Sequence, residues 1–187
     1  MEIKNKFFLN AKDSVLVVID VQEKLCRAMD DKVLRHLVAN AGILLEAAAE
    51  LQIPVVGTEQ YVKGLGELLP ELKNRLGEPT HEKMTFSCCG DPTFTEKLKV
   101  LGKKQVIIVG MECHVCVLQT VIELLDADFN VHLVRDAVMS RRKDNWLVGL
   151  ETARDAGAVI TSTETALFQL LKVAGTDEFR KLSKLVR

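Results

Sequence analysis

Three residues that lie far apart in the chain have the types needed to attack a carbonyl group together: Asp20, Lys83 and Cys116. A cysteine thiolate is a strong nucleophile. A carboxylate beside it can take the thiol proton and then deliver it to a leaving amine. A lysine ammonium would stabilise the thiolate and fix the carboxylate. Each residue alone also has a common structural explanation, so its position among the predicted elements decides the interpretation.

Cys116 follows the apolar run Gln105–Val109 at a predicted strand-to-helix junction. Unpaired N–H groups and the helix dipole favour a thiolate at a helix start. The same N–H groups could bind an oxyanion. Asp20 directly follows the apolar run Ser14–Ile19. These positions predict a nucleophile and a general base at one edge of a sheet.

Short, β-branched apolar runs alternate with amphipathic stretches along the chain. The runs predict buried strands at Ser14–Ile19, Ile53–Val56, Gln105–Val109, Asn130–Val134 and Ala158–Thr161, with a short one near His81–Met84. Helices are predicted at 33–51, from Asp91-Pro92 onward, and at 117–126, 144–156, 163–173 and 176–186. This alternation predicts an α/β fold, a doubly wound three-layer α/β/α sandwich with a mostly parallel sheet. Ligands bind beyond the carboxyl ends of such strands.

Length and composition narrow the class of protein. A chain of 187 residues suits a single domain spanning 1–187. Its 25 basic and 26 acidic residues are nearly balanced and form no long run, so we expect no nucleic-acid or membrane partner. The N-terminus lacks a signal-peptide pattern. Five cysteines, an odd number, argue against a secreted disulfide framework, which favours a cytoplasmic protein.

Three motifs, in order, resemble those of isochorismatase-like cysteine hydrolases. The first is Ile19-Asp20-Val21-Gln22, and the second is Glu82-Lys83 followed by Phe86-Ser87. The third is Gly110-Met-Glu-Cys-His-Val-Cys116-Val117, followed by Thr120. The similarity runs from about Asp13 to Leu171. The chain most resembles the isochorismatase domain-containing subgroup, because of its segment Glu-Gln-Tyr-x-x-Gly-Leu-Gly.

The resemblance implies a six-stranded Rossmann-like sheet and a catalytic triad of Asp20, Lys83 and Cys116. It implies hydrolysis of a C–N bond in a small amide-like substrate through a thioester on Cys116, without a cofactor. It also implies a cis peptide at Met111–Glu112, which would aim the N–H groups of Glu112 and Cys116 at the oxyanion. Members of the family form homo-oligomers, so we expect a dimer or a larger assembly.

Two departures from better-known members narrow the activity. Metal-dependent nicotinamidases carry Asp-x-His and a further histidine after the second strand, whereas Thr58–Gly66 contains neither residue type. We therefore predict no metal. True isochorismatases cleave a vinyl ether without this cysteine, so Cys116 favours the amidase-like branch. The sequence leaves the substrate undetermined.

Other interpretations remain open. A non-catalytic binding or scaffolding protein could keep the fold, and Cys113-His-Val-Cys116 is formally a redox C-x-x-C pair. A zinc site at these cysteines and the adjacent Cys88-Cys89 has poor ligand spacing, and we interpret Cys113 as packed against the sheet. A basic cluster at 141–143 could attract a substrate carboxylate or simply face solvent. Four residues are candidate liners of a substrate pocket: Gln22, Glu59, Tyr61 and Phe86.

Overall fold

A computed structural model describes residues 2–187 and contains one six-stranded, wholly parallel sheet. The strand order is β3-β2-β1-β4-β5-β6. The strands are β1 Ser14–Ile19, β2 Val55–Gln60, β3 His81–Lys83, β4 Gln105–Met111, β5 Asn130–Met139 and β6 Val159–Thr161. This confirms the predicted α/β sandwich, with every strand parallel.

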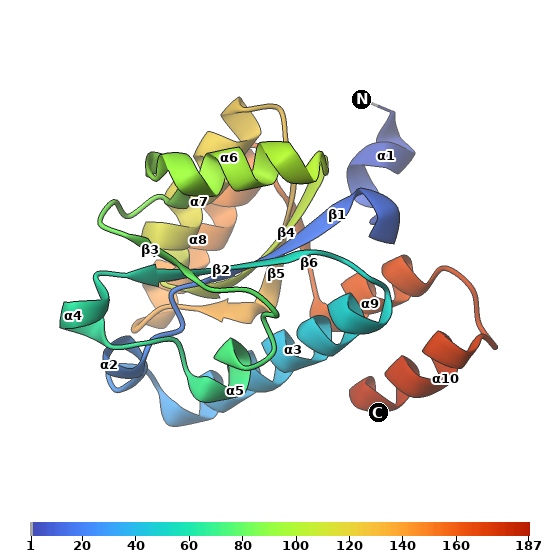
Figure 1. The fold of residues 1–187 in the computed structure, drawn as a ribbon, viewed down its shortest axis with the longest axis horizontal. Coiled ribbons are helices and arrows are strands. Elements are labelled where there is room, and N and C mark those ends of the chain that lie inside the picture. Colours follow the sequence, from blue (N-terminus) through green and yellow to red (C-terminus); the bar gives the residue numbers. More distant parts are fainter. Residues whose placement is uncertain (1) are drawn as a thin grey trace.

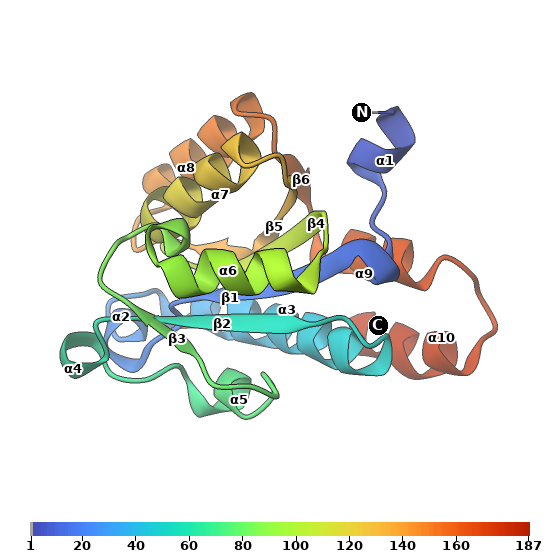
Figure 2. The same cartoon turned by 45° about the horizontal axis from the view of Figure 1, so that its top comes forward.

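Helices cover both faces of the sheet and complete the three layers (Figures 1 and 2). On one face lie α6 Pro92–Leu101, α7 Leu118–Asp126 and α8 Lys143–Asp155. On the other lie α3 Asp31–Glu50 and α9 Thr163–Leu171, with α10 Asp177–Leu182 packed outside them. Shorter helices are α1 Ile3–Phe7, α2 Glu23–Cys26, α4 Val62–Leu65 and α5 Pro70–Lys73.

The alternation of side chains along β1 shows why these runs form buried strands. Val15, Val17 and Ile19 face α6–α8, whereas Leu16 and Val18 face α3. Successive side chains of a strand point to opposite faces, so a strand covered on both sides must be apolar throughout. The two cores on either side of the sheet hold it between the helical layers.

Capping side chains begin two helices where the sequence predicted. Asp30 accepts hydrogen bonds from the first-turn N–H groups of α3. Asp91 does the same for α6 ahead of Pro92. These bonds pair N–H groups that have no partner inside the helix, which fixes the start of each helix. The four short helices α1, α2, α4 and α5 were not predicted, because so few residues show no periodicity.

Two strands, β2 and β5, differ most from their predicted bounds. β2 covers Val55–Gln60 instead of Ile53–Val56, so the polar residues expected after it lie within it. β5 continues to Met139, five residues beyond the predicted end at Val134. A register irregularity between Ile108 and Gly110 lets β5 resume its pairing with β4 after two exposed residues. Polar side chains interrupt the apolar pattern in both extensions, so the sequence did not predict them as strand.

No helix among residues 2–187 is both long and apolar enough to cross a membrane.

Candidate active site

The three candidate catalytic residues come from three neighbouring parts of the sheet edge. Asp20 directly follows β1, Lys83 is the last residue of β3, and Cys116 lies in a π-helical turn, Cys113–Val117, between β4 and α7. Because all strands are parallel, their carboxyl ends meet at this edge. The topology thereby brings together Asp20 and Lys83, which are 63 residues apart in the chain.

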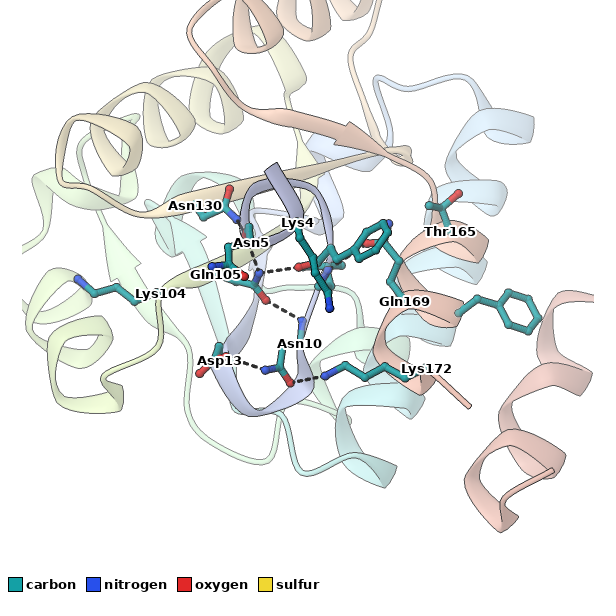
Figure 3. A pocket seen from close by; sticks show the side chains of 13 residues that line it. Lys4, Asn5, Asn10, Asp13, Lys104, Gln105, Asn130, Thr165, Gln169 and Lys172 are labelled. Carbon is teal, nitrogen blue, oxygen red and sulfur yellow. Dashed lines mark hydrogen bonds between the residues drawn. The ribbon is translucent and has the colours of Figure 1, made fainter. Parts of the chain in front are cut away.

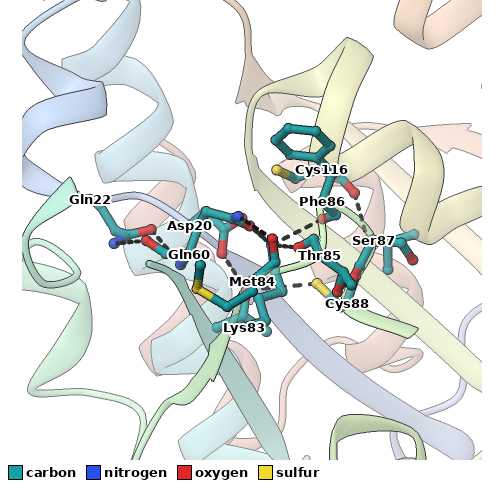
Figure 4. A network of polar contacts seen from close by, with 12 residues as sticks. Asp20, Gln22, Gln60, Lys83, Met84, Thr85, Phe86, Ser87, Cys88 and Cys116 are labelled. Atoms are coloured by element: carbon teal, nitrogen blue, oxygen red, sulfur yellow. Dashed lines mark hydrogen bonds and ion pairs between the residues drawn. The ribbon is translucent and has the colours of Figure 1, made fainter. Parts of the chain in front are cut away.

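The Asp20 carboxylate is fully buried, and each of its oxygens accepts a hydrogen bond (Figure 4). Lys83 Nζ donates to Oδ2 at 2.7 Å. The Thr58 hydroxyl donates to Oδ1 at 2.7 Å. The backbone of Asp20 has a φ of 51°, which turns the chain sharply out of β1. The carboxylate is thus held from both β2 and β3.

Lys83 is also buried, and its ammonium is surrounded by acceptors. Besides Asp20, it donates to Gln60 Oε1 at 2.7 Å and to the carbonyl oxygens of Thr85 at 3.2 Å and Phe86 at 3.0 Å. Burial opposes the positive charge, but the nearby Asp20 carboxylate outweighs it and raises the pKa of Lys83 above its usual value. Lys83 therefore remains charged and also anchors the loop that follows β3.

The surroundings of the Cys116 thiol favour its protonated form over the thiolate. Burial and the negative charge of Asp20 raise its pKa to about 12, although Lys83 acts in the opposite direction. The helix start and the lysine favour a thiolate, but burial beside a carboxylate costs more. A base at the site would therefore have to take the proton from the thiol.

The backbone before Cys116 is tightly fitted against β1. Gly110 has a φ of 127°, and a Cβ there would lie 2.1 Å from the carbonyl oxygen of Ile19. The peptide bond between Met111 and Glu112 is cis, at the position that the resemblance implies. The Glu112 carboxylate accepts from the Arg141 backbone N–H at 2.9 Å and from its Nε at 3.1 Å. These bonds fix one end of the turn that carries Cys116. They also mean that Arg141, one residue of the basic cluster, is hydrogen-bonded within the protein.

The four candidate pocket residues separate into two groups. Gln22 is fully buried and bonded to backbone: its Oε1 accepts from Gln60 N–H, and its Nε2 donates to Gln60 O. Glu59 accepts from Leu68 N–H at 2.7 Å and from Lys73 Nζ at 3.0 Å, so its carboxylate is not directed at Asp20. Tyr61 and Phe86 are exposed. The structure therefore places Gln22 and Glu59 in structural hydrogen bonds and leaves the two aromatic residues accessible.

Four other residues hold the site together. Thr58 and Gln60 from β2 contact Asp20 and Lys83 respectively. The Thr120 hydroxyl donates to Cys116 O at 2.6 Å and accepts from Cys88 N–H at 2.9 Å. None of these four residues was predicted as a site residue, although residues two apart on a strand, such as Thr58 and Gln60, share a face.

The two cysteines of the C-x-x-C pair have different surroundings. Cys113 contacts α8, where its Sγ lies 3.7 Å from Trp146 O and packs closely against Gly149. Cys116 instead contacts Asp20. The five cysteines, all within the described part of the chain, are free. Among residues 2–187 no group of three histidine, cysteine or acidic side chains is placed to hold a metal ion.

A cavity of about 990 Å³ lies at the opposite edge of the sheet, between the N-terminal segment and α9 (Figure 3). Its polar side chains are occupied by that segment. Gln105 donates to Phe8 O at 2.8 Å and accepts from Asn10 N–H at 2.7 Å, while Asn130 donates to Asn5 O at 3.0 Å. These hydrogen bonds attach the N-terminal segment to the sheet. The residues that line the cavity do not include any member of the triad.

Residues 14–165 match the family model described as the isochorismatase domain. The chain belongs to the isochorismatase family. Isochorismatase domain-containing protein 2 of Danio rerio is 37% identical over 95% of this chain and 89% of its own. The secreted isochorismatase effector Isc1 of Phytophthora sojae is 39% identical over 93% of this chain and 84% of its own. Both similarities span nearly the whole isochorismatase fold.

A solved structure of the same family, the MAR1 ribonuclease of Caenorhabditis elegans, superposes with a TM-score of 0.88. It is 37% identical and covers 96% of this chain and 92% of its own. The fold is therefore that of an isochorismatase-family protein, and family membership indicates a hydrolase.

Proposed function

We propose that this protein is a metal-free cysteine hydrolase that cleaves a C–N bond in a small amide-like substrate. The observation that supports it best is the buried Asp20 carboxylate, which Lys83 holds at 2.7 Å and whose charge acts on the buried Cys116 thiol. A scaffolding protein would have no need to bury a carboxylate, an ammonium and a thiol against one another, since burying such groups is costly.

In the proposed mechanism, Cys116 loses its proton during the attack and not before it. Asp20 takes the thiol proton as Sγ bonds to the substrate carbonyl carbon. The protonated Asp20 then gives this proton to the leaving amine as the C–N bond breaks, which leaves a thioester on Cys116. A water molecule next transfers a proton to Asp20 and attacks the thioester. The acid product leaves, and Asp20 returns the proton to the sulfur.

Lys83 and the turn before Cys116 would support these steps. The Lys83 ammonium lowers the pKa of the Cys116 thiol, so it stabilises the thiolate that forms during attack. We assign the backbone N–H groups of Glu112 and Cys116 to the developing oxyanion. Tyr61 and Phe86, both exposed, are the candidates for contacting the substrate.

The test is an ammonia-release screen over small amides, ureas and carbamoyl compounds. The Cys116→Ala variant should lose all measurable turnover, and Cys26→Ala, which changes a buried cysteine outside the site, should retain it. The thioester predicts an acyl adduct on Cys116 by intact mass after rapid acid quench. Turnover that survives in Cys116→Ala would refute the mechanism.

RNA hydrolysis is a second candidate, because a relative of known structure carries the name ribonuclease. The balanced charge of this chain and the full use of the Lys83 ammonium by protein acceptors favour a small uncharged substrate instead. A fluorescently labelled RNA in the same screen would distinguish the two. Cleavage of RNA that depends on Cys116 would replace the amide substrate with RNA.

We further propose a cytoplasmic homo-oligomer. Five free cysteines suit a reducing compartment. Light scattering after size exclusion would measure the assembly, and cell fractionation would locate the protein.

A further inference from the structure

Each oxygen of the Asp20 carboxylate accepts a hydrogen bond from a side chain, and one of these two donors is uncharged. Lys83 occupies Oδ2, and the Thr58 hydroxyl occupies Oδ1, each at 2.7 Å. Thr58 is fully buried on β2, in register with Ile19, the residue before Asp20. The hydroxyl therefore reaches the carboxylate directly from the adjacent strand.

The Thr58 hydroxyl donates to Asp20 and accepts from a third residue. A hydroxyl has a single proton, and an ionised carboxylate can only accept, so Thr58 is the donor in its bond to Asp20. The Cys88 Sγ lies 3.7 Å from Thr58 Oγ1 and donates to it. Cys88 is fully buried, and burial raises its pKa to about 12, so its thiol stays protonated. The result is a chain of donors from Cys88 through Thr58 to Asp20.

Some groups around the Asp20 carboxylate hold it in place, and one group reacts with it in the proposed mechanism. The ammonium of Lys83 approaches from β3, and the Cys88 thiol lies in the short turn Cys88–Gly90 before α6. The Cys116 thiol approaches from the turn before α7. Lys83 and Thr58 hold one oxygen each, and Cys116 is the group whose proton the carboxylate takes in the proposed reaction.

We propose that Thr58, oriented by Cys88, is a positioning residue that aims the Asp20 carboxylate at the Cys116 thiol. This inference rests on the proposed function of Asp20 as the base. A hydrogen bond to the ionised carboxylate favours that form over the protonated one. Thr58 and Cys88 keep their own protons throughout, so the proton passes only from Cys116 to Asp20 and on to the leaving amine.

Removing the hydroxyl should therefore slow the transfer of the thiol proton to Asp20 without weakening substrate binding. In Thr58→Val, kcat should fall about tenfold with little change in KM, because a hydrogen bond to a charged group is lost. Alkylation of Cys116 by iodoacetamide at pH 7, read by peptide mass, should slow by a similar factor. Thr58→Ser keeps the hydroxyl and should restore both readouts.

Thr161→Val is the matched control. Thr161 is a buried strand threonine on β6 whose hydroxyl has no hydrogen-bond partner among the described residues. Its loss should leave kcat and the alkylation rate of Cys116 unchanged. Cys88→Ala should lower both in the same direction as Thr58→Val, by a smaller factor.

The alkylation of Cys116 does not require turnover, so the two proposals can fail separately. An unchanged alkylation rate in a folded Thr58→Val protein would overturn the role of Thr58, whatever the activity. Turnover that survives in Cys116→Ala would instead overturn the proposed mechanism, and with it the role of Asp20 that this inference assumes.

Discussion

Replacing Lys83 with methionine would leave the Asp20 charge buried without its partner. The Lys83 and Asp20 side chains are 1% and 0% exposed, and Nζ and Oδ2 lie 2.7 Å apart. At that distance and an effective dielectric constant of about 20, the attraction is about 6 kcal/mol. Desolvation offsets much of this when the pair is buried, but a lone buried charge keeps its cost. We expect Lys83→Met to lower the free energy of unfolding by about 4 kcal/mol at pH 7.

Urea denaturation of four proteins measures this effect: the parent, Lys83→Met, Asp20→Asn and the double variant. The double variant should recover about 2 kcal/mol relative to Lys83→Met, because no charge is then left buried. Lys97→Met is the control, since its pair with Glu78 is exposed at 28% and 59% and should contribute less than about 1 kcal/mol. A loss in Lys83→Met no larger than in this control would refute the reasoning.

Three further predictions concern other parts of the molecule. Gly110→Ala should lower the free energy of unfolding, measured by thermal unfolding, by more than about 3 kcal/mol, because its Cβ would lie 2.1 Å from Ile19 O. Gly157 also has a positive φ but has open space around it, so Gly157→Ala should lose only about 1–2 kcal/mol in the same assay. Burial lowers the pKa of His132 from 6.5 to about 4, so the unfolded state binds more protons between these values and stability is lost as the pH falls. We expect the parent to lose about 2 kcal/mol between pH 7 and pH 5, and a folded His132→Leu variant that loses as much would contradict this. The Cys116 pKa of about 12 predicts that alkylation by iodoacetamide, followed by intact mass against Cys116→Ala, still accelerates above pH 10, and a plateau below pH 9 would count against it.

Much of the fold follows from the period of the apolar residues. The runs at Ser14–Ile19 and Gln105–Val109 were continuous and β-branched, and both are central strands. β2 was misplaced because Thr58, Glu59 and Gln60 interrupt the apolar pattern. These polar side chains can lie inside a buried strand because hydrogen bonds to Asp20, Leu68 and Lys83 pair their polar atoms, and a sequence does not show such partners.

The motifs identified the site residues, but they did not predict which of these residues are protonated. The positions of Asp20, Lys83 and Cys116 relative to the strands brought them to the same edge of the sheet, as expected. The protonation of Cys116 depends on how deeply it is buried and how near Asp20 lies, and both are properties of packing. Thr58 illustrates the same limit, because a buried threonine on a strand is ordinary until its partner is known.

The strand order also bears on how the protein acquires its site as it folds. Asp20 and Cys116 follow neighbouring central strands, whereas Lys83 ends the edge strand β3 and reaches Asp20 across β2. Parallel pairing between such distant segments forms slowly, since long loops must close first. The charge pair can therefore form only after β1, β2 and β3 have joined. During refolding, the Asp20–Lys83 contact would report completion of the sheet, and helix content measured by circular dichroism would recover before it.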